Sequence, residues 1–180
     1  NENDSATQIT NAITVTDTTD TNMESGSVSI TTGYANGQDV LAANTGGTSI
    51  VANFVPASGV LTLTGSDTLA NYQQVLRIVT YVNTSENPST ATRVLSFKVN
   101  DGDVDSNIAT RSISVAAVND VPVAQASSVT TAQNVPVALA VSDFNFTDAE
   151  SNPLASITIS SLTLAVGDTL KLNGVDVAVN

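Results

Sequence analysis

The sequence predicts an all-β protein made of antiparallel β-sandwiches. Apolar and polar residues alternate with a period of two along most of the 180 residues, and turn-forming pairs that contain glycine separate the alternating stretches. Val, Ile and Thr are frequent in these stretches, and such β-branched residues suit a pleated sheet with one buried and one solvated face. Many short strands joined by regular turns are typical of a sandwich.

The alternation locates the expected strands. The stretch 94–99 places Leu95, Phe97 and Val99 on one face, and the stretch 111–116 places Ile113 and Val115 inward. The same pattern predicts further strands at 13–15, 28–30, 61–63, 157–159 and 170–172. Asn-Gly, Gly-Gly and Asp-Gly pairs predict turns at 36–37, 45–47, 101–102 and 173–174.

One segment departs from the period of two and predicts a single short helix. Within 67–76 the apolar residues recur at helical spacing, at Leu69, Tyr72, Val75 and Leu76. Ser66 or Asp67 is expected to cap the N-terminus of this helix. We therefore expect one helix of about two turns that crosses between the sheets of the first sandwich.

The charge balance excludes a nucleic-acid-binding protein. The chain carries 17 acidic and 5 basic residues, which gives a formal net charge of −12 at pH 7. Neutralising phosphates needs clustered Lys and Arg, whereas the basic residues here are scattered. Hydrophobic residues make up 41% of the chain, as in an ordinary globular protein. No apolar run approaches the roughly 20 residues of a membrane helix, so insertion into a membrane is not expected.

The inventory of side chains argues against an enzyme. The sequence contains no Cys and no His, which excludes a Ser-His-Asp or Cys-His nucleophile and an ordinary zinc site. Two-carboxylate glycosidase chemistry stays open, but its clefts are lined with aromatic rings, and aromatic residues are 4% of this chain. The cofactor that suits an abundance of carboxylates is a hard, oxygen-binding cation, above all calcium.

The chain contains two copies of one module. Thr16-Asp17 and the stretch 28–30 are echoed by Thr147-Asp148 and the stretch 157–159. Glu2 precedes Asp17 by fifteen residues, Gln133 precedes Asp148 by fifteen, and each of the two is followed by asparagine. The stretch 59–65 also matches 167–174, with one residue inserted. Self-similarity of this kind predicts an array of repeated modules.

The repeat predicts two domains that meet in a linker. Residues 1–120 form the first module, whose N-terminal edge we expect to be clipped, and residues 121–180 form the first half of a second, truncated module. The join lies in the segment 118–122, where Pro122 ends the last strand of the first module. The second copy lacks the later strands of the first, which is expected to leave an unpaired edge.

Three stretches carry a resemblance to a known family. They read Tyr-Val-Asn-Thr-Ser-Glu-Asn-Pro at 81–88, Phe-Lys-Val-Asn-Asp-Gly-Asp at 97–103 and Ala-Val-Asn-Asp-Val-Pro at 117–122. Together they resemble the cadherin-like repeats of large bacterial surface adhesins and RTX-type repetitive proteins, over one nearly complete repeat and the first half of another. The resemblance implies immunoglobulin-like sandwiches in tandem, often with calcium between neighbours, that form stalks outside the cell.

The first expected calcium cluster lies at the join between the modules. Asn119 and Asp120 belong to the linker, and Asp148 and Glu150 follow Asp120 by 28 and 30 residues in a loop expected at the top of the second module. Calcium takes six to eight oxygen ligands, so the linker and the nearest loops would have to share one ion. The family's linker has an Asp where this chain has Ala117 or Val118, and a Glu is common where Gln133 stands. Both departures remove negative charge and predict a weak or partly occupied site.

The second expected cluster lies at the opposite end of the first module and would serve a preceding repeat. Its members come from the last hairpin turn and from the segment before 28–30, and they are Asp101, Asp103, Asp105, Asp17 and Asp20. An alternative stays open for both clusters, because Asp-Gly in a hairpin and Asn-Asp before proline also form turns without any metal.

These observations favour a structural function. We expect a stalk module of a secreted, repetitive surface adhesin, with neighbouring repeats of the same protein as its partners and calcium stiffening the joints. The alternative is a self-assembling extracellular filament or surface-layer subunit, in which identical subunits complete one another by strand donation. Carbohydrate binding by Tyr34, Tyr72 and Tyr81 is less favoured, since tyrosines of a sandwich are more often buried.

Overall fold

The computed structural model describes residues 1–177 and divides the chain into two units, Asn1–Val121 and Pro122–Asn180. The all-β prediction is confirmed, because every pair of hydrogen-bonded strands is antiparallel and one α-helix accompanies them in the described residues. No helix among residues 1–177 combines the length and the apolar character that a bilayer crossing requires.

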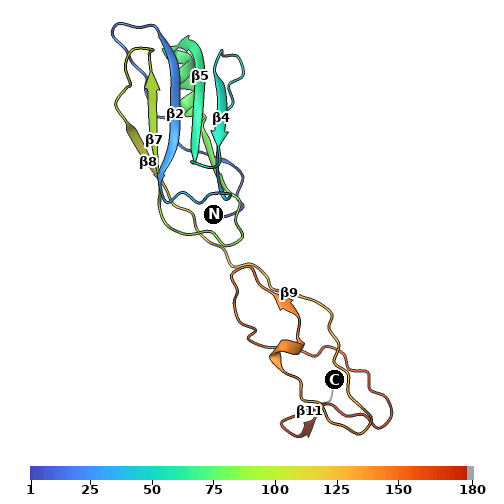
Figure 1. Cartoon of the computed structure of the whole chain (residues 1–180). Coiled ribbons are helices and arrows are strands. Elements are labelled where there is room, and N and C mark those ends of the chain that lie inside the picture. The colour runs from blue at the N-terminus through green and yellow to red at the C-terminus, as the bar shows by residue number, and fades with distance from the viewer. Residues whose placement is uncertain (178–180) are drawn as a thin grey trace. The chain divides into compact units, whose positions relative to one another are not determined.

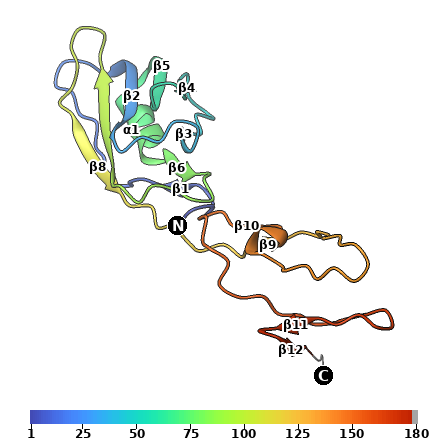
Figure 2. The same cartoon turned by 60° about the horizontal axis from the view of Figure 1, so that its bottom comes forward.

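Two antiparallel sheets build the first unit. The larger sheet has the order β4-β5-β2-β7-β8, and Figure 1 shows these strands side by side. The smaller sheet has the order β1-β6-β3, which Figure 2 shows together with the helix α1. The strands are β1 (Thr7–Gln8), β2 (Asn22–Thr32), β3 (Asp39–Ala42), β4 (Val51–Val55), β5 (Val60–Thr68), β6 (Thr80–Asn83), β7 (Arg93–Asn100) and β8 (Ala109–Ile113).

Alternation decides which face of the central strands is buried. In β7 the buried and half-buried residues alternate without a break, and Leu95, Phe97 and Val99 are buried as predicted. On the neighbouring strand β2, Val28 lies opposite Phe97 and Ile30 lies opposite Leu95. Cross-strand apolar pairs of this kind stabilise a sheet and fix its register.

The helix α1 spans Leu69–Arg77 and buries Tyr72, Val75 and Leu76. The prediction of a short helix in this segment is confirmed, but both predicted caps are wrong. Thr68 is the N-cap, and its hydroxyl accepts a hydrogen bond of 3.2 Å from the backbone N–H of Asn71. Asp67 instead accepts a hydrogen bond of 2.7 Å from the Asn71 side chain. The chain stays in β5 up to Thr68, so the first orphan N–H groups of the helix come within reach of that residue.

One hydrophobic core serves both sheets and the helix. Its buried members come from β2, β3, β5, β6, β7 and α1, and they include Val28, Leu41, Leu63, Tyr72, Tyr81 and Leu95. The hydroxyl of Tyr72 donates to the carbonyl of Gly65 at 2.7 Å, and burial raises the pKa of Tyr72 to about 12. Two of the three tyrosines are therefore core residues, and Tyr34 packs partly buried against the same core.

The expected strand at 13–15 does not form. Ile13 and Val15 do pack against the core, as the alternation suggests, but the segment bonds to side chains of the helix instead of to a strand. The Nε of Arg77 donates to the carbonyl of Ile13 at 2.7 Å, and Gln73 accepts from the N–H of Val15 at 3.2 Å. Because these side chains provide hydrogen-bond partners for the backbone groups, the segment does not have to pair with a neighbouring strand. Strand β8 likewise ends at Ile113, although Val115 is buried as predicted.

The second unit contains short strand pairs. β9 (Val123–Ala124) pairs with β10 (Phe146–Thr147), β11 (Lys171–Leu172) pairs with β12 (Val175–Asp176), and Val141–Asp143 forms a 3₁₀ turn, η1. The expected strand at 157–159 is absent, and no residue of 122–177 is buried. The predicted turn at Asn173-Gly174 is confirmed, with φ of 52° and 83°, as a tight hairpin between β11 and β12 requires.

The two units share unusual backbone conformations at positions that the internal repeat aligns. Asn3 and Asn134 both have a positive φ, of 54° and 62°, which few non-glycine residues adopt. The glycines that bound the aligned strand also have positive φ in both copies, at Gly59, Gly65, Gly167 and Gly174. The repeat is thus visible in the backbone as well as in the sequence.

Candidate metal centres

Three carboxylates gather where β2 begins and β7 ends. Carboxylate oxygens of Asp17, Asp20 and Asp101 lie within 4.8 Å of one another. The antiparallel register explains this, because Ser25 near the start of β2 lies opposite Asn100 at the end of β7. Asp17 and Asp20 precede β2, and Asp101 follows β7, so the sheet brings the two segments together.

Turn hydrogen bonds hold two of these carboxylates in place. The Oδ1 of Asp17 accepts from the backbone N–H groups of Thr19 and Asp20, both at 2.7 Å. These backbone hydrogen bonds stabilise the charged carboxylate and lower the pKa of Asp17, and the bond from Asp20 has the largest effect. The Oδ1 of Asp101 accepts from the N–H of Asp103 at 2.9 Å and of Val104 at 2.7 Å. In both residues the turn bonds fall on a single carboxylate oxygen.

The other two predicted members of this cluster lie apart from it. Asp105 forms an ion pair of 2.6 Å with Lys98 and accepts a hydrogen bond of 3.0 Å from Asn100. The hydrogen bond from Lys98 and, to a smaller extent, that from Asn100 lower the pKa of Asp105. Asp103 contributes its backbone N–H to the Asp101 turn and is not one of the three gathered carboxylates.

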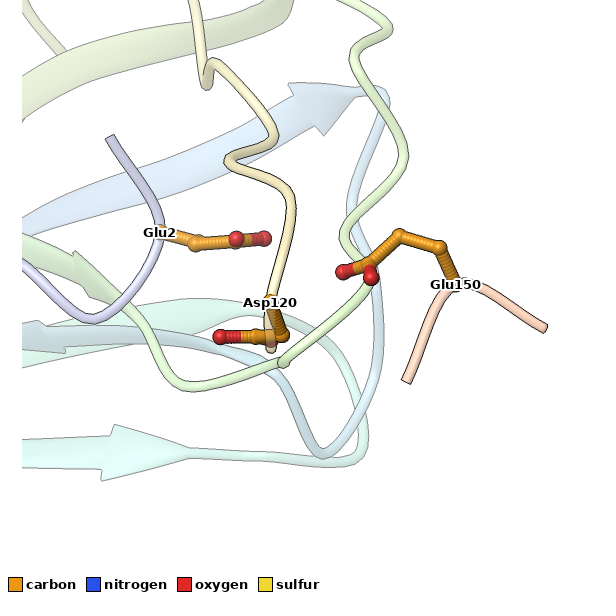
Figure 3. A group of neighbouring side chains, drawn as sticks. All are labelled: Glu2, Asp120 and Glu150. Carbon is orange, nitrogen blue, oxygen red and sulfur yellow. The ribbon is translucent and has the colours of Figure 1, made fainter. Parts of the chain in front are cut away.

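A second group of carboxylates involves Glu2 and Asp120 at the end of the first unit. Their carboxylate oxygens lie within 4.8 Å, and Figure 3 shows Glu2 reaching from the N-terminal segment toward the segment that carries Asp120. The backbone N–H of Glu2 donates to the carbonyl of Ala116 at 3.0 Å, and its Oε1 accepts from the N–H of Val118 at 2.8 Å. The N-terminal segment is thereby fixed against the last residues of the unit.

Glu2 carries an unsatisfied oxygen in a buried position. Only 6% of the residue is exposed, and its Oε2 has no hydrogen-bond partner in the part of the chain that the structure describes. A buried carboxylate oxygen without a partner is costly, and a second carboxylate nearby adds repulsion. A cation beside Oε2 would relieve both costs.

The remaining predicted ligands lie close to the join or in the second unit. Asn119 donates from Nδ2 to the carbonyl of Asp120 at 2.8 Å. In the second unit, Asp148 follows β10, and its Oδ1 accepts from the N–H of Asn152 at 2.8 Å. Glu150, also drawn in Figure 3, lies in the same turn, two residues after Asp148.

Glu2 was not predicted as a candidate ligand. The internal repeat aligns Glu2 with Gln133, a position where glutamate is common in the family that the chain resembles. This alignment could have identified Glu2 as a candidate ligand. Its hydrogen-bond partner Val118 lies 116 residues away in the sequence, so no local pattern reports the contact.

A buried ion pair was also not predicted. Asp39 accepts hydrogen bonds of 2.6 Å from both Tyr81 and Asn83, one of 2.8 Å from the N–H of Ala35, and one of 3.2 Å from Nε of Arg93. Burial alone would raise the pKa of Asp39, but these hydrogen bonds outweigh it and leave the pKa lowered. Since both carboxylate oxygens are already satisfied, this group is structural and offers no vacant ligand atom.

We compared the chain with protein-family models, curated proteins and solved structures. No family model, curated protein or solved structure matches it.

Proposed function

We propose that this chain is a stalk module of a secreted, repetitive surface protein, in which calcium stiffens the joints between neighbouring repeats. The observation that carries the proposal is the buried, unpartnered Oε2 of Glu2 beside Asp120, directly before the boundary between the two units. A carboxylate pair at the very end of a module is where a cation can act on the connection to the next one.

Calcium is the cation that this chemistry favours. Both candidate centres offer carboxylates alone, and the sequence contains neither Cys nor His. Calcium binds oxygen ligands at about 2.3–2.6 Å with flexible geometry, which suits carboxylates drawn from separate loops. Asn119, which is adjacent to Asp120 in the first unit, is proposed to add an oxygen ligand to the ion held by Glu2 and Asp120. The involvement of Asp148 and Glu150 stays a prediction from the sequence.

The fold of the first unit supports the proposed immunoglobulin-like, cadherin-like sandwich. A five-stranded and a three-stranded antiparallel sheet share one core in the first unit, as the two sheets of a sandwich do. The two candidate centres also lie at opposite ends of β7. Asp101 directly follows the C-terminal end of this strand. At the N-terminal end, Arg93 pairs with Ile113, the last residue of β8, and the chain continues from there to Asp120. A module with one centre at each end can join a neighbour on both sides.

The proposed mechanism is electrostatic. Without an ion, repulsion between the carboxylates loosens the end of the module and the joint that follows it. A bound divalent cation cancels this charge, and because it binds only the assembled arrangement, it stabilises that arrangement. Loss of the metal is therefore expected to soften the joint before either module unfolds.

Small-angle X-ray scattering of the full chain in calcium and in chelator tests this function. We expect a longer and stiffer particle in calcium, and the same flexible particle in both buffers for the variant Glu2→Gln. Asp168→Asn is the matched control, because it removes one exposed acidic charge far from both carboxylate groups in the sequence. Scattering curves that do not change with calcium would contradict the proposal.

A second candidate function is a self-assembling filament or surface-layer subunit completed by a strand from its neighbour. The specific observation in its favour is that the described residues of the second unit bury no side chain. Because the second unit contains many apolar side chains, their exposure to solvent favours the binding of a partner that covers them.

A further inference from the structure

The second unit exposes apolar side chains in strand-like sequence. Within 122–177 no residue is buried, although alternating apolar residues recur along the segment. The exposed large side chains include Val135, Leu139, Ile157, Ile159, Leu164 and Leu172. Exposed apolar surface of this extent marks an interaction site.

The first unit shows what covers the equivalent residues. Val28 and Ile30, which the repeat aligns with Ile157 and Ile159, are 0% and 5% exposed. Each lies directly opposite an apolar residue of β7, Phe97 in one case and Leu95 in the other. Ile157 and Ile159 are 47% and 43% exposed, and the described second unit contains no strand beside them. Among the neighbours that help to bury Val28 and Ile30 in the first unit, β7 has no counterpart in the described part of the second unit.

The aligned strand on the other side of β2 shows the same difference. Leu61 and Leu63 of β5 are 1% and 0% exposed, and β5 pairs with β2 over most of its length. Leu172, the counterpart of Leu63, is 68% exposed, and β11 pairs only with β12. A strand at 157–159 would thus restore the arrangement of the first unit, and such a strand needs a partner to pair with.

We propose that the second unit is an acceptor for an extended partner segment of the β7 type. This segment has apolar side chains at every second position and carries a positive charge. The alternation of β7 supplies the apolar face, and the strand contains Arg93 and Lys98 but no acidic residue. The second unit carries five acidic residues against Lys171 alone, namely Asp143, Asp148, Glu150, Asp168 and Asp176. Apolar alternation and opposite charge together specify the partner, and main-chain pairing supplies affinity by β-augmentation.

This inference does not depend on calcium. It rests on the burial difference between aligned residues, whereas the stalk function rests on the carboxylates of Glu2 and Asp120. The two proposals can therefore fail independently, and the test below is run in chelator for that reason.

The test adds a peptide of residues 91–100 to the full chain and follows amide hydrogen exchange by mass spectrometry. We expect exchange in the region 153–163 to slow by about tenfold or more, which is the mark of a newly paired strand. The control peptide carries Leu95→Ser, Phe97→Ser and Val99→Ser, which keeps the charge and removes the apolar face. It is expected to protect nothing.

A chain variant makes the test specific. Ile157→Asp with Ile159→Asp is expected to abolish the protection by the peptide while leaving exchange in the first unit unchanged, which shows that the first unit still folds. Three outcomes would overturn the proposal. They are no protection by the peptide, equal protection by the control peptide, and protection of 153–163 that rises with chain concentration in the absence of peptide. The last would make a second copy of this chain the occupant.

Discussion

Asp39 and Arg93 form an ion pair in which neither side chain is exposed to solvent, with 3.2 Å between Nε and Oδ2. Asp39 belongs to β3 in the smaller sheet and Arg93 belongs to β7 in the larger one, so the pair connects the two sheets through the core. Arg93 also donates to the carbonyl of Ala91 at 2.7 Å and to that of Ser89, which fixes the segment before β7.

Removing one partner of this pair is expected to destabilise the first unit strongly. Asp39→Ala leaves the guanidinium of Arg93 buried without its counter-ion, and such changes cost about 3–5 kcal/mol in the free energy of unfolding. Urea denaturation followed by tyrosine fluorescence measures it. Asp105→Ala breaks the exposed pair with Lys98 and serves as the control, with an expected loss much smaller than that of Asp39→Ala, because solvent screens an exposed pair. Equal losses for the two variants would refute a role for the buried pair.

The same pair predicts how stability depends on pH. The pKa of Asp39 is lower in the folded chain than in the unfolded one, so the carboxylate contributes stability above its unfolded pKa. That contribution is lost as the pH falls through the folded pKa, because the unfolded state then binds a proton more readily. We expect the free energy of unfolding to decrease below about pH 4, which is the ordinary pKa range of Asp. Asp39→Asn is expected to flatten this decrease, and an unchanged pH profile in the variant would contradict the assignment.

The N-cap of α1 can be tested by two neighbouring alanine substitutions. Thr68→Ala removes the hydroxyl that accepts from Asn71 and is expected to lower the free energy of unfolding by about 1 kcal/mol. Ser66→Ala is the matched control, because the Ser66 hydroxyl bonds to Glu24 at the surface and not to the helix. A larger effect at Ser66 than at Thr68 would show that the cap is misassigned.

The effect of Glu2→Gln on thermal stability is expected to depend on calcium. In chelator, Glu2→Gln removes the repulsion with Asp120 and is expected to raise the Tm of the first unit or leave it unchanged. In calcium, the wild-type chain is expected to gain several degrees that the variant does not gain. Thermal unfolding by circular dichroism in the two buffers checks both parts. A variant with the full calcium-dependent gain would remove Glu2 from the proposed site.

The central strands and the helix could be predicted because their signals are local, whereas the shorter strands β3, β4 and β6 were not predicted. Leu95, Phe97 and Val99 alternate within one strand, and Tyr72, Val75 and Leu76 recur at helical spacing within one turn or two. The stretch 13–15 shows the limit of such signals. It alternates like a strand, but side chains of Gln73 and Arg77 satisfy its backbone, and that depends on tertiary packing.

The candidate sites were predictable only where the expected sandwich topology brings two loops to the same end of the module. The expected topology placed the last hairpin turn beside the segment of Asp17 and Asp20, and the pairing of β2 with β7 brings Asp101 close to both. The contact of Glu2 with Asp120 joins opposite ends of the unit and has no local signature. The buried pair could have been found from the alternation within its strands. Arg93 lies two residues before Leu95 and Asp39 lies two residues before Leu41, so each charged residue is on the same, inward face as its apolar neighbour.

Calcium titration of the full chain by isothermal calorimetry tests the central claim most directly. The account predicts saturable heat with a Kd of about 0.1–1 mM, as in extracellular calcium modules. It also predicts that Glu2→Gln weakens or abolishes this binding while Asp168→Asn leaves it intact. A titration without heat, or one that Glu2→Gln does not alter, would contradict the claim that calcium is held at the carboxylates of Glu2 and Asp120.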